Sequence, residues 1–98
     1  VLGYINELQR RAYGNDDHKI ADSDLTLDFL LKERARELYW EGHRRTDLIR
    51  YGMFTTDKYL WQWKGGEKGG TAVNSKYNIY PIPNTELTAN PNLYNENY

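Results

Sequence analysis

The segment from Glu33 to Gly52 constrains the fold of this 98-residue chain more than any other part of its sequence. It reads ERARELYWEGHRRTDLIRYG and mixes arginines and acids with large apolar residues, among them Tyr39, Trp40 and Leu48. A solvated surface has no need of tryptophan, and an ordinary core has no need of so many arginines. The segment therefore predicts two short helices whose charged groups pair with one another while their apolar groups point inward.

Helical spacing of apolar residues predicts three helices in residues 1–52. They run from Val1 to Tyr13, from about Thr26 to a break at Gly42, and from about His43 to Tyr51. Thr26 or Asp24 is the expected N-cap of the second helix, since both residue types are favoured there. Glycine ends helices because it adopts positive φ without a steric penalty. Gly14 and Gly52 are accordingly the expected stops of the first and third helices.

Residues 53–79 lack this periodicity, and we expect a variable loop or insertion there. Within it, Tyr59, Trp61 and Trp63 alternate with other residues, as in a short strand or an extended loop. The run KGGEKGG lacks the residue order of a phosphate-binding loop and favours a mobile turn. Residues 80–98 predict an extended tail with one helical turn at Thr85–Ala89. The expected fold class is mainly α, with long loops and little β.

Composition excludes several classes of function. Thirteen basic and 14 acidic residues give a net charge of −1, which argues against a nucleic-acid partner. The chain has no cysteine, so these residues form no disulfide and hold no thiolate metal site or thiol nucleophile. No apolar run approaches the ~20 residues of a membrane helix, and no signal peptide is visible. Since a helical pattern starts at Val1, we expect a single fragment, residues 1–98, of a longer protein.

The glutamates Glu33, Glu37 and Glu41 share one helical face because they recur every four residues. Paired carboxylates act as acid and base in glycoside hydrolysis. An arginine beside a carboxylate favours its charged form, however, which suits a structural pair better than a general acid. We therefore expect no catalytic residue. The predicted role is a partly buried structural ion-pair network that locks the two helices together, formed by Glu33, Arg34, Glu37, Glu41, Arg44, Asp47 and Arg50.

Metal binding has little support in the sequence. The acidic stretch Asn15–Asp24 lacks the ligand order and the central glycine of an EF-hand loop, so it predicts a solvated loop. The two histidines, His18 and His43, are far apart and form no HExxH pair. We expect neither a metal nor a cofactor.

Tyr59, Trp61 and Trp63 are the candidate ligand-binding residues. Flat aromatic rings stack on the apolar faces of sugars and of other flat ligands. The same rings could instead pack as core, or as a lid over the main helix. Both interpretations stay open, and the ligand site is not assigned from the sequence.

Three motifs resemble the SusD/RagB family. They are YINELQRRAYG, then LLKERARELYWEGHRRTDLIRYGMF, and finally YPIPNTELTANPNLYNENY. The chain departs from the family at its last residues, which read NENY where the family favours Gln-Asn-Pro-Gly-Tyr. The resemblance implies the C-terminal part of a SusD-like, tetratricopeptide-like α-helical fold, in which the matching charged residues have a structural role.

The resemblance also implies a function. Such a protein would be a surface-exposed lipoprotein of the outer membrane of a Bacteroidetes-type bacterium, anchored through an N-terminal cysteine that this fragment lacks. It would capture oligosaccharides without cleaving them, for uptake through a SusC-like TonB-dependent transporter. Its other expected partner is the remainder of the same polypeptide. The alternatives are a tetratricopeptide-type protein–protein interaction module without a sugar ligand, and a piece of a glycoside hydrolase.

Overall fold

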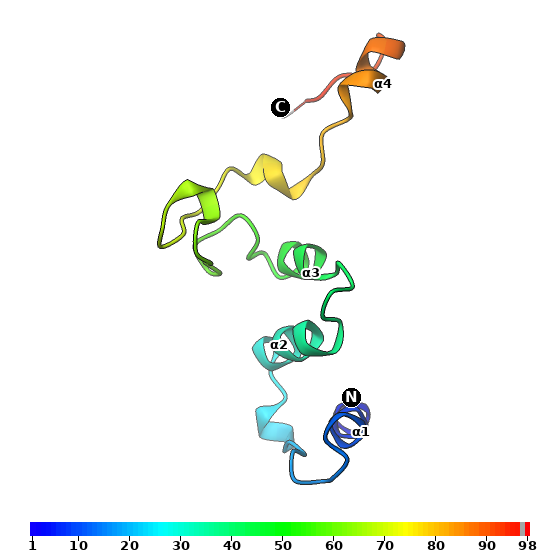
Figure 1. Ribbon diagram of the computed structural model, residues 1–98, viewed down its shortest axis with the longest axis vertical. Coiled ribbons are helices and arrows are strands. Elements are labelled where there is room, and N and C mark those ends of the chain that lie inside the picture. Colours follow the sequence, from blue (N-terminus) through cyan, green and yellow to red (C-terminus); the bar gives the residue numbers. More distant parts are fainter. Residues whose placement is uncertain (97) are drawn as a thin grey trace. The chain divides into compact units, whose positions relative to one another are not determined.

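The computed structural model describes residues 1–96 and 98, which form α-helices joined by turns and long loops (Figure 1). The chain divides into two compact units, which we call the N-terminal unit (residues 1–43) and the C-terminal unit (residues 44–98). The first contains α1 (Leu2–Tyr13) and α2 (Leu27–Glu37), and the second contains α3 (Arg44–Arg50) and α4 (Asn84–Ala89). No β-strand occurs among the described residues, and the predicted mainly α class is confirmed.

Helix α1 ends where the sequence predicts. Gly14 adopts φ 74°, and its N–H donates to the carbonyl oxygen of Arg10 at 2.8 Å. Arg10 and Arg11 occupy the last turn, where the negative end of the helix dipole favours cations. This ending turns the chain into the acidic loop that leads to α2.

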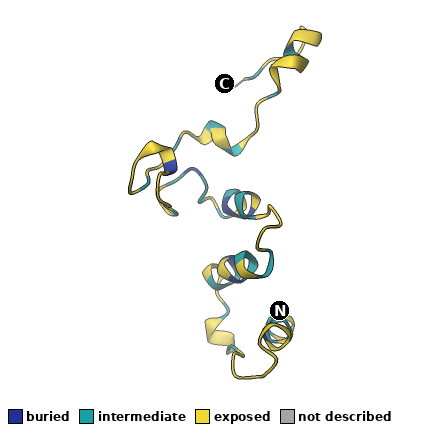
Figure 2. Cartoon of the chain, in the orientation of Figure 1, coloured by how far each residue is buried: buried dark blue, intermediate teal, exposed yellow. Residues whose placement is uncertain are grey.

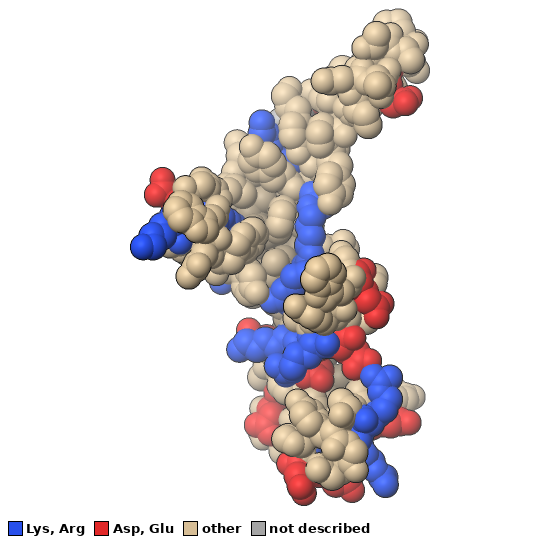
Figure 3. Space-filling model, viewed as in Figure 1, with Lys and Arg blue, Asp and Glu red and all other residues tan. Residues whose placement is uncertain are grey.

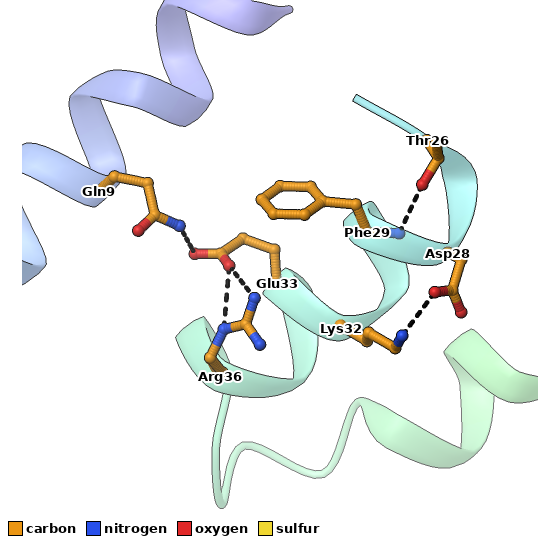
Figure 4. A network of polar contacts seen from close by, with 7 residues as sticks. All are labelled: Gln9, Thr26, Asp28, Phe29, Lys32, Glu33 and Arg36. Carbon is orange, nitrogen blue, oxygen red and sulfur yellow. Dashed lines mark hydrogen bonds and ion pairs between the residues drawn. The ribbon is translucent and has the colours of Figure 1, made fainter. Parts of the chain in front are cut away.

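Helix α2 begins as predicted and ends earlier than predicted. The Thr26 hydroxyl accepts a hydrogen bond from the Phe29 N–H at 3.1 Å, which is an N-cap (Figure 4). The last helical residue is Glu37, five positions before the predicted break at Gly42. The reason is a turn in which Trp40 and Gly42 both have positive φ, at 67° and 76°. A right-handed helix has to end before its first left-handed residue.

This turn also overrides the expected orientation of two aromatic residues. Tyr39 and Trp40 lie in it, beyond the end of the α2 apolar stripe, and both are exposed in this chain. Trp40 is 88% exposed. The prediction that the apolar groups of this segment point inward is therefore wrong for Tyr39 and Trp40, and right for Leu48, which is buried in α3.

Buried apolar side chains are few among the described residues (Figure 2). Leu31 of α2 and Leu48 of α3 are the buried hydrophobic residues. The other buried side chains are polar or charged: Gln9, Glu33, Asp47, Thr55 and Lys64. Because a buried polar group is costly without a partner, the hydrogen bonds of these side chains decide how each unit is held together.

The C-terminal unit continues from α3 into a folded loop. The Leu48 carbonyl oxygen accepts hydrogen bonds from the N–H groups of Met53 and Phe54, at 2.8 and 3.1 Å, and Gly52 has φ 65°. The predicted stop at Gly52 is therefore confirmed. Residues 59–63 form no strand, because the chain turns there and the Lys64 N–H donates to the Trp61 carbonyl oxygen at 3.1 Å.

Short 3₁₀ turns and one side-chain clip organise the rest of this unit. The 3₁₀ turns are Lys64–Gly66 and Ser75–Asn78. The Asn95 side chain accepts from the Ile82 N–H at 2.8 Å and donates to the Ile82 carbonyl oxygen at 3.1 Å, so it pairs with that residue like a neighbouring strand. None of the helices in the described residues has the length and apolar content needed to cross a bilayer.

Candidate functional site

Glu33 is the centre of a polar cluster in the N-terminal unit (Figure 4). Its Oε1 accepts a hydrogen bond from Gln9 Nε2 at 2.7 Å. Its Oε2 accepts from both Nε and Nη2 of Arg36, at 3.0 and 2.7 Å. Gln9 and Glu33 are buried, and the carboxylate links α1 to α2 through Gln9, while Arg36 of α2 supplies its other two hydrogen bonds.

Two further ion pairs hold the N-terminal unit. Lys32 pairs with Asp28 at 2.6 Å along α2, as expected from their four-residue spacing. Glu37 accepts a hydrogen bond from the Arg11 guanidinium of α1. Glu37 therefore provides a second link between α1 and α2, close to where both helices end.

In the C-terminal unit, the buried Asp47 pairs with Arg50 along α3, with Oδ1 and Nη1 3.4 Å apart. The Arg44 guanidinium lies 4.8 Å from the centre of the Tyr59 ring. Of the other residues of the predicted network, Glu41 is exposed and Arg34 lies within α2. The pairs Glu33–Arg36 and Asp47–Arg50 are three positions apart and Asp28–Lys32 four, which are the spacings of neighbours on one helical face. The locking of two helices by the whole network stays a prediction.

This arrangement has the chemistry of a brace. Glu33 and Glu37 each accept hydrogen bonds from an arginine, as the carboxylates of structural ion pairs do. Among the described residues, no group of three or more histidine, aspartate or glutamate side chains could hold a metal ion. On the face shown in Figure 3, the red acidic and blue basic groups lie side by side over α1 and α2.

A prediction follows for Glu33. We expect Glu33→Ala to lower the free energy of unfolding by about 2 kcal/mol, because it leaves the buried Gln9 amide without its acceptor. Denaturant unfolding of the full-length protein measures the change. Glu7→Ala, on the exposed side of α1, is the matched control and should change stability by less than about 0.5 kcal/mol. Equal effects of the two substitutions would contradict the role assigned to Glu33.

The candidate ligand site lies in the C-terminal unit, in a groove with a volume of about 780 Å³ that we call the aromatic groove. The side chains of Arg45 and Lys64 give its lining two positive charges. No aspartate or glutamate of the described residues lines it. The aromatic residues that line it are Phe54, Trp61, Tyr77, Tyr80 and Tyr98.

Arg45 joins α3 to the residues that follow the loop. Its guanidinium carbon lies 3.9 Å from the centre of the Tyr80 ring and 5.1 Å from that of Phe54. Its Nη2 donates to the Tyr77 carbonyl oxygen at 2.6 Å. A guanidinium stacked on rings in this way keeps further N–H groups for other acceptors.

Lys64 is 2% exposed, which is unusual for a lysine. Its Nζ donates to the carbonyl oxygens of Thr56 and Tyr59, at 2.5 and 2.7 Å, and lies 4.8 Å from the centre of the Trp61 ring. Lys64 therefore fixes the turn that carries Tyr59 and Trp61. The sequence carries no signal for this role, because a lysine before two glycines is typical of an exposed turn.

The three aromatic candidates have different surroundings. Trp61 lines the aromatic groove and also an adjoining pocket of about 300 Å³, which Tyr59 shares. Its ring centre lies 6.0 Å from that of Phe54 and 6.1 Å from that of Tyr59. Trp63 lines neither space, although it is 64% exposed. The ligand-binding role of all three residues stays a prediction.

Comparison with known proteins assigns the family. The model of the SusD family matches residues 1–98. The chain is 53% identical, over 99 aligned positions, to the starch-binding protein SusD of Bacteroides thetaiotaomicron. The match covers 100% of this chain and 17% of that relative, so the chain spans about one sixth of the relative's length. The match runs along the whole length of the chain and includes the motifs of residues 30–54 and 80–98. The chain therefore belongs to the SusD family.

Proposed function

We propose that the protein binds oligosaccharides at the cell surface without cleaving them. The observation that carries the proposal is the 53% identity, over the whole chain, to a protein named for starch binding. The polar clusters of Glu33 and Glu37 support it further, since their carboxylates are engaged by donors in a bracing role. The chain contributes scaffold and one aromatic groove, and the remainder of the polypeptide completes the protein.

The proposal extends to location and partner. The protein is attached to the outer membrane by a lipid on an N-terminal cysteine upstream of these residues, and it faces the outside of the cell. It delivers its ligand to a SusC-like TonB-dependent transporter. Membership of the SusD family supports both statements.

A tetratricopeptide-type interaction module without a sugar ligand is the alternative function. It has less support, because the alignment to a starch-binding protein, at 53% identity, covers the whole chain. The groove also favours a small ligand, since exposed rings and hydrogen-bond donors meet in it. The hydrolase alternative would need two facing carboxylates, and Glu33 and Glu37 are instead paired with arginines.

Titration calorimetry on the full-length protein tests the proposal. A panel of neutral and acidic oligosaccharides should contain at least one ligand that binds saturably, with no reducing sugar released during prolonged incubation. The heat-unfolded protein is the control for non-specific heats. Absence of binding to the whole panel by folded protein, or release of sugar, would overturn the proposed function.

A second experiment addresses the transporter. Mild detergent extraction of native membranes, followed by affinity capture of the tagged protein, should recover a TonB-dependent outer-membrane transporter in near-equal amount. A variant whose upstream lipid-attachment cysteine is replaced by serine should lose its membrane association. Recovery of the protein alone from intact outer membranes would contradict the proposed partner.

A further inference from the structure

We infer that the aromatic groove is a saccharide subsite in its own right, and that it takes acidic oligosaccharides, those whose sugars carry carboxylate groups. This inference deepens the proposed function and rests on it. It concerns residues 44–98 alone, because every residue that lines the groove belongs to the C-terminal unit.

Exposed aromatic rings supply the stacking surface. Trp61 keeps 41% of its surface exposed, and Tyr77, Tyr80 and Tyr98 are exposed to a greater extent. All four line the same groove of about 780 Å³, which is large enough for several sugar rings. The apolar faces of pyranose rings stack on such surfaces, and a groove suits a chain-like ligand.

Two of the polar side chains of the groove, Arg45 and Lys64, are charged and can only donate, and they favour a ligand that carries acceptors. Arg45 carries a full charge and has N–H groups beyond the one used by Tyr77. The Asn74 Oδ1 already accepts one hydrogen bond, from the Lys76 N–H at 2.9 Å, and its amide N–H groups are further donors in the lining. Neutral sugar hydroxyls need acceptors as well as donors, whereas carboxylate oxygens need only donors.

The charge of the groove points the same way. Arg45 and Lys64 both line it, and no carboxylate of the described residues does. The Lys64 ammonium is almost fully buried and is held by two carbonyl oxygens and the Trp61 ring, which leave its net charge in place. A cationic, acid-free groove lowers the free energy of a bound anion more than that of a neutral sugar.

Backbone contacts tie together the two sides of the loop that carries Trp61. The Thr71 N–H donates to the Lys64 carbonyl oxygen at 3.0 Å, and Gly70 has φ 81°. A Cβ atom on Gly70 would lie 2.4 Å from the Trp61 carbonyl oxygen, so only glycine allows this close approach. A loop tied in this way loses less conformational entropy when a ligand binds than an untied loop does.

The test compares two tryptophans that are two positions apart in the full-length protein. Tetragalacturonic acid is the acidic probe and maltotetraose the neutral one, both titrated at about 50 mM and about 500 mM NaCl. We expect Trp61→Ala to weaken binding of tetragalacturonic acid about tenfold, the loss typical of one stacked ring. Trp63→Ala removes an exposed ring outside the groove and should change the affinity less than about twofold.

A third variant tests the charge. Arg45→Gln should abolish the preference of the protein for the acidic probe and reduce the salt dependence of its affinity, with maltotetraose binding changed far less. Tyr80→Ala, at an exposed ring of the same groove, provides a second stacking variant in case Trp61→Ala fails to fold.

The outcomes separate the two proposals. Wild-type binding of maltotetraose without binding of tetragalacturonic acid would overturn the acidic subsite and leave oligosaccharide capture intact. Equal affinities of wild type, Trp61→Ala and Tyr80→Ala for the acidic probe would also overturn the acidic subsite. A groove covered by the rest of the polypeptide would overturn it too. Failure of the folded wild type to bind any oligosaccharide would remove the proposed function as well.

Discussion

Replacement of Leu31 by alanine should lower the free energy of unfolding of the full-length protein by about 3 kcal/mol. Leu31 is 2% exposed and lies in the middle of α2, two positions before Glu33. The substitution removes buried methyl groups and leaves a cavity, and both effects destabilise the folded state. Few apolar side chains are buried among the described residues, so the N-terminal unit has little other core to compensate.

Leu27→Ala is the matched control for this prediction. Leu27 is the same residue type on the same helix, and it is 71% exposed. Its replacement should change the free energy of unfolding by less than about 0.5 kcal/mol, because no cavity is created. Denaturant unfolding of both variants gives the comparison. Similar destabilisation by the two substitutions would show that Leu27 is covered by other parts of the full-length protein, and would contradict the special position of Leu31.

The helices could be predicted from the sequence because their signals are local. Thr26 and Gly14 act on backbone groups within four residues, and the pairs Asp28–Lys32 and Glu33–Arg36 depend only on helical spacing. Such contacts form whenever the helix forms. Their presence needs no knowledge of how distant parts of the chain meet.

The remaining contacts depend on distant residues, and the sequence does not indicate them. Gln9 is 24 positions from Glu33, and no pattern links the two before α1 and α2 lie together. The early end of α2 depends on the left-handed conformation of Trp40, which a bulky residue rarely adopts. The predicted inward orientation of Trp40 was wrong for this reason, since a residue in such a turn leaves the helical stripe.

The aromatic groove illustrates the same limit. Tyr59, Trp61 and Trp63 were candidates from their composition and alternation alone, which cannot distinguish among them. The structure separates them, because the buried Lys64 bends the chain so that Trp61 faces the groove and Trp63 does not line it. In the sequence, Arg45 is one arginine among several. Its contact with the Tyr80 ring joins residues 35 positions apart, and no local pattern indicates it.

Lys64→Met should lower the free energy of unfolding by about 3 kcal/mol. Methionine keeps much of the apolar stem but supplies no donor, so the carbonyl oxygens of Thr56 and Tyr59 lose the hydrogen bonds they receive from the ammonium group. Each buried acceptor left without a donor costs about 1–3 kcal/mol. Two such acceptors would cost about 2–6 kcal/mol together, and removal of the buried charge offsets part of this cost, so the expected loss lies in the lower half of that range.

Lys68→Met provides the control, since Lys68 belongs to the same glycine-rich run and is exposed. It should leave stability within about 0.5 kcal/mol of wild type. Amide hydrogen exchange should also be faster in residues 55–71 of Lys64→Met, because the turn that places Trp61 loses its clamp. If Lys64→Met were as stable as wild type and protected to the same extent, the ammonium group would not hold this loop. The position of Trp61, on which the acidic subsite depends, would then have no physical basis.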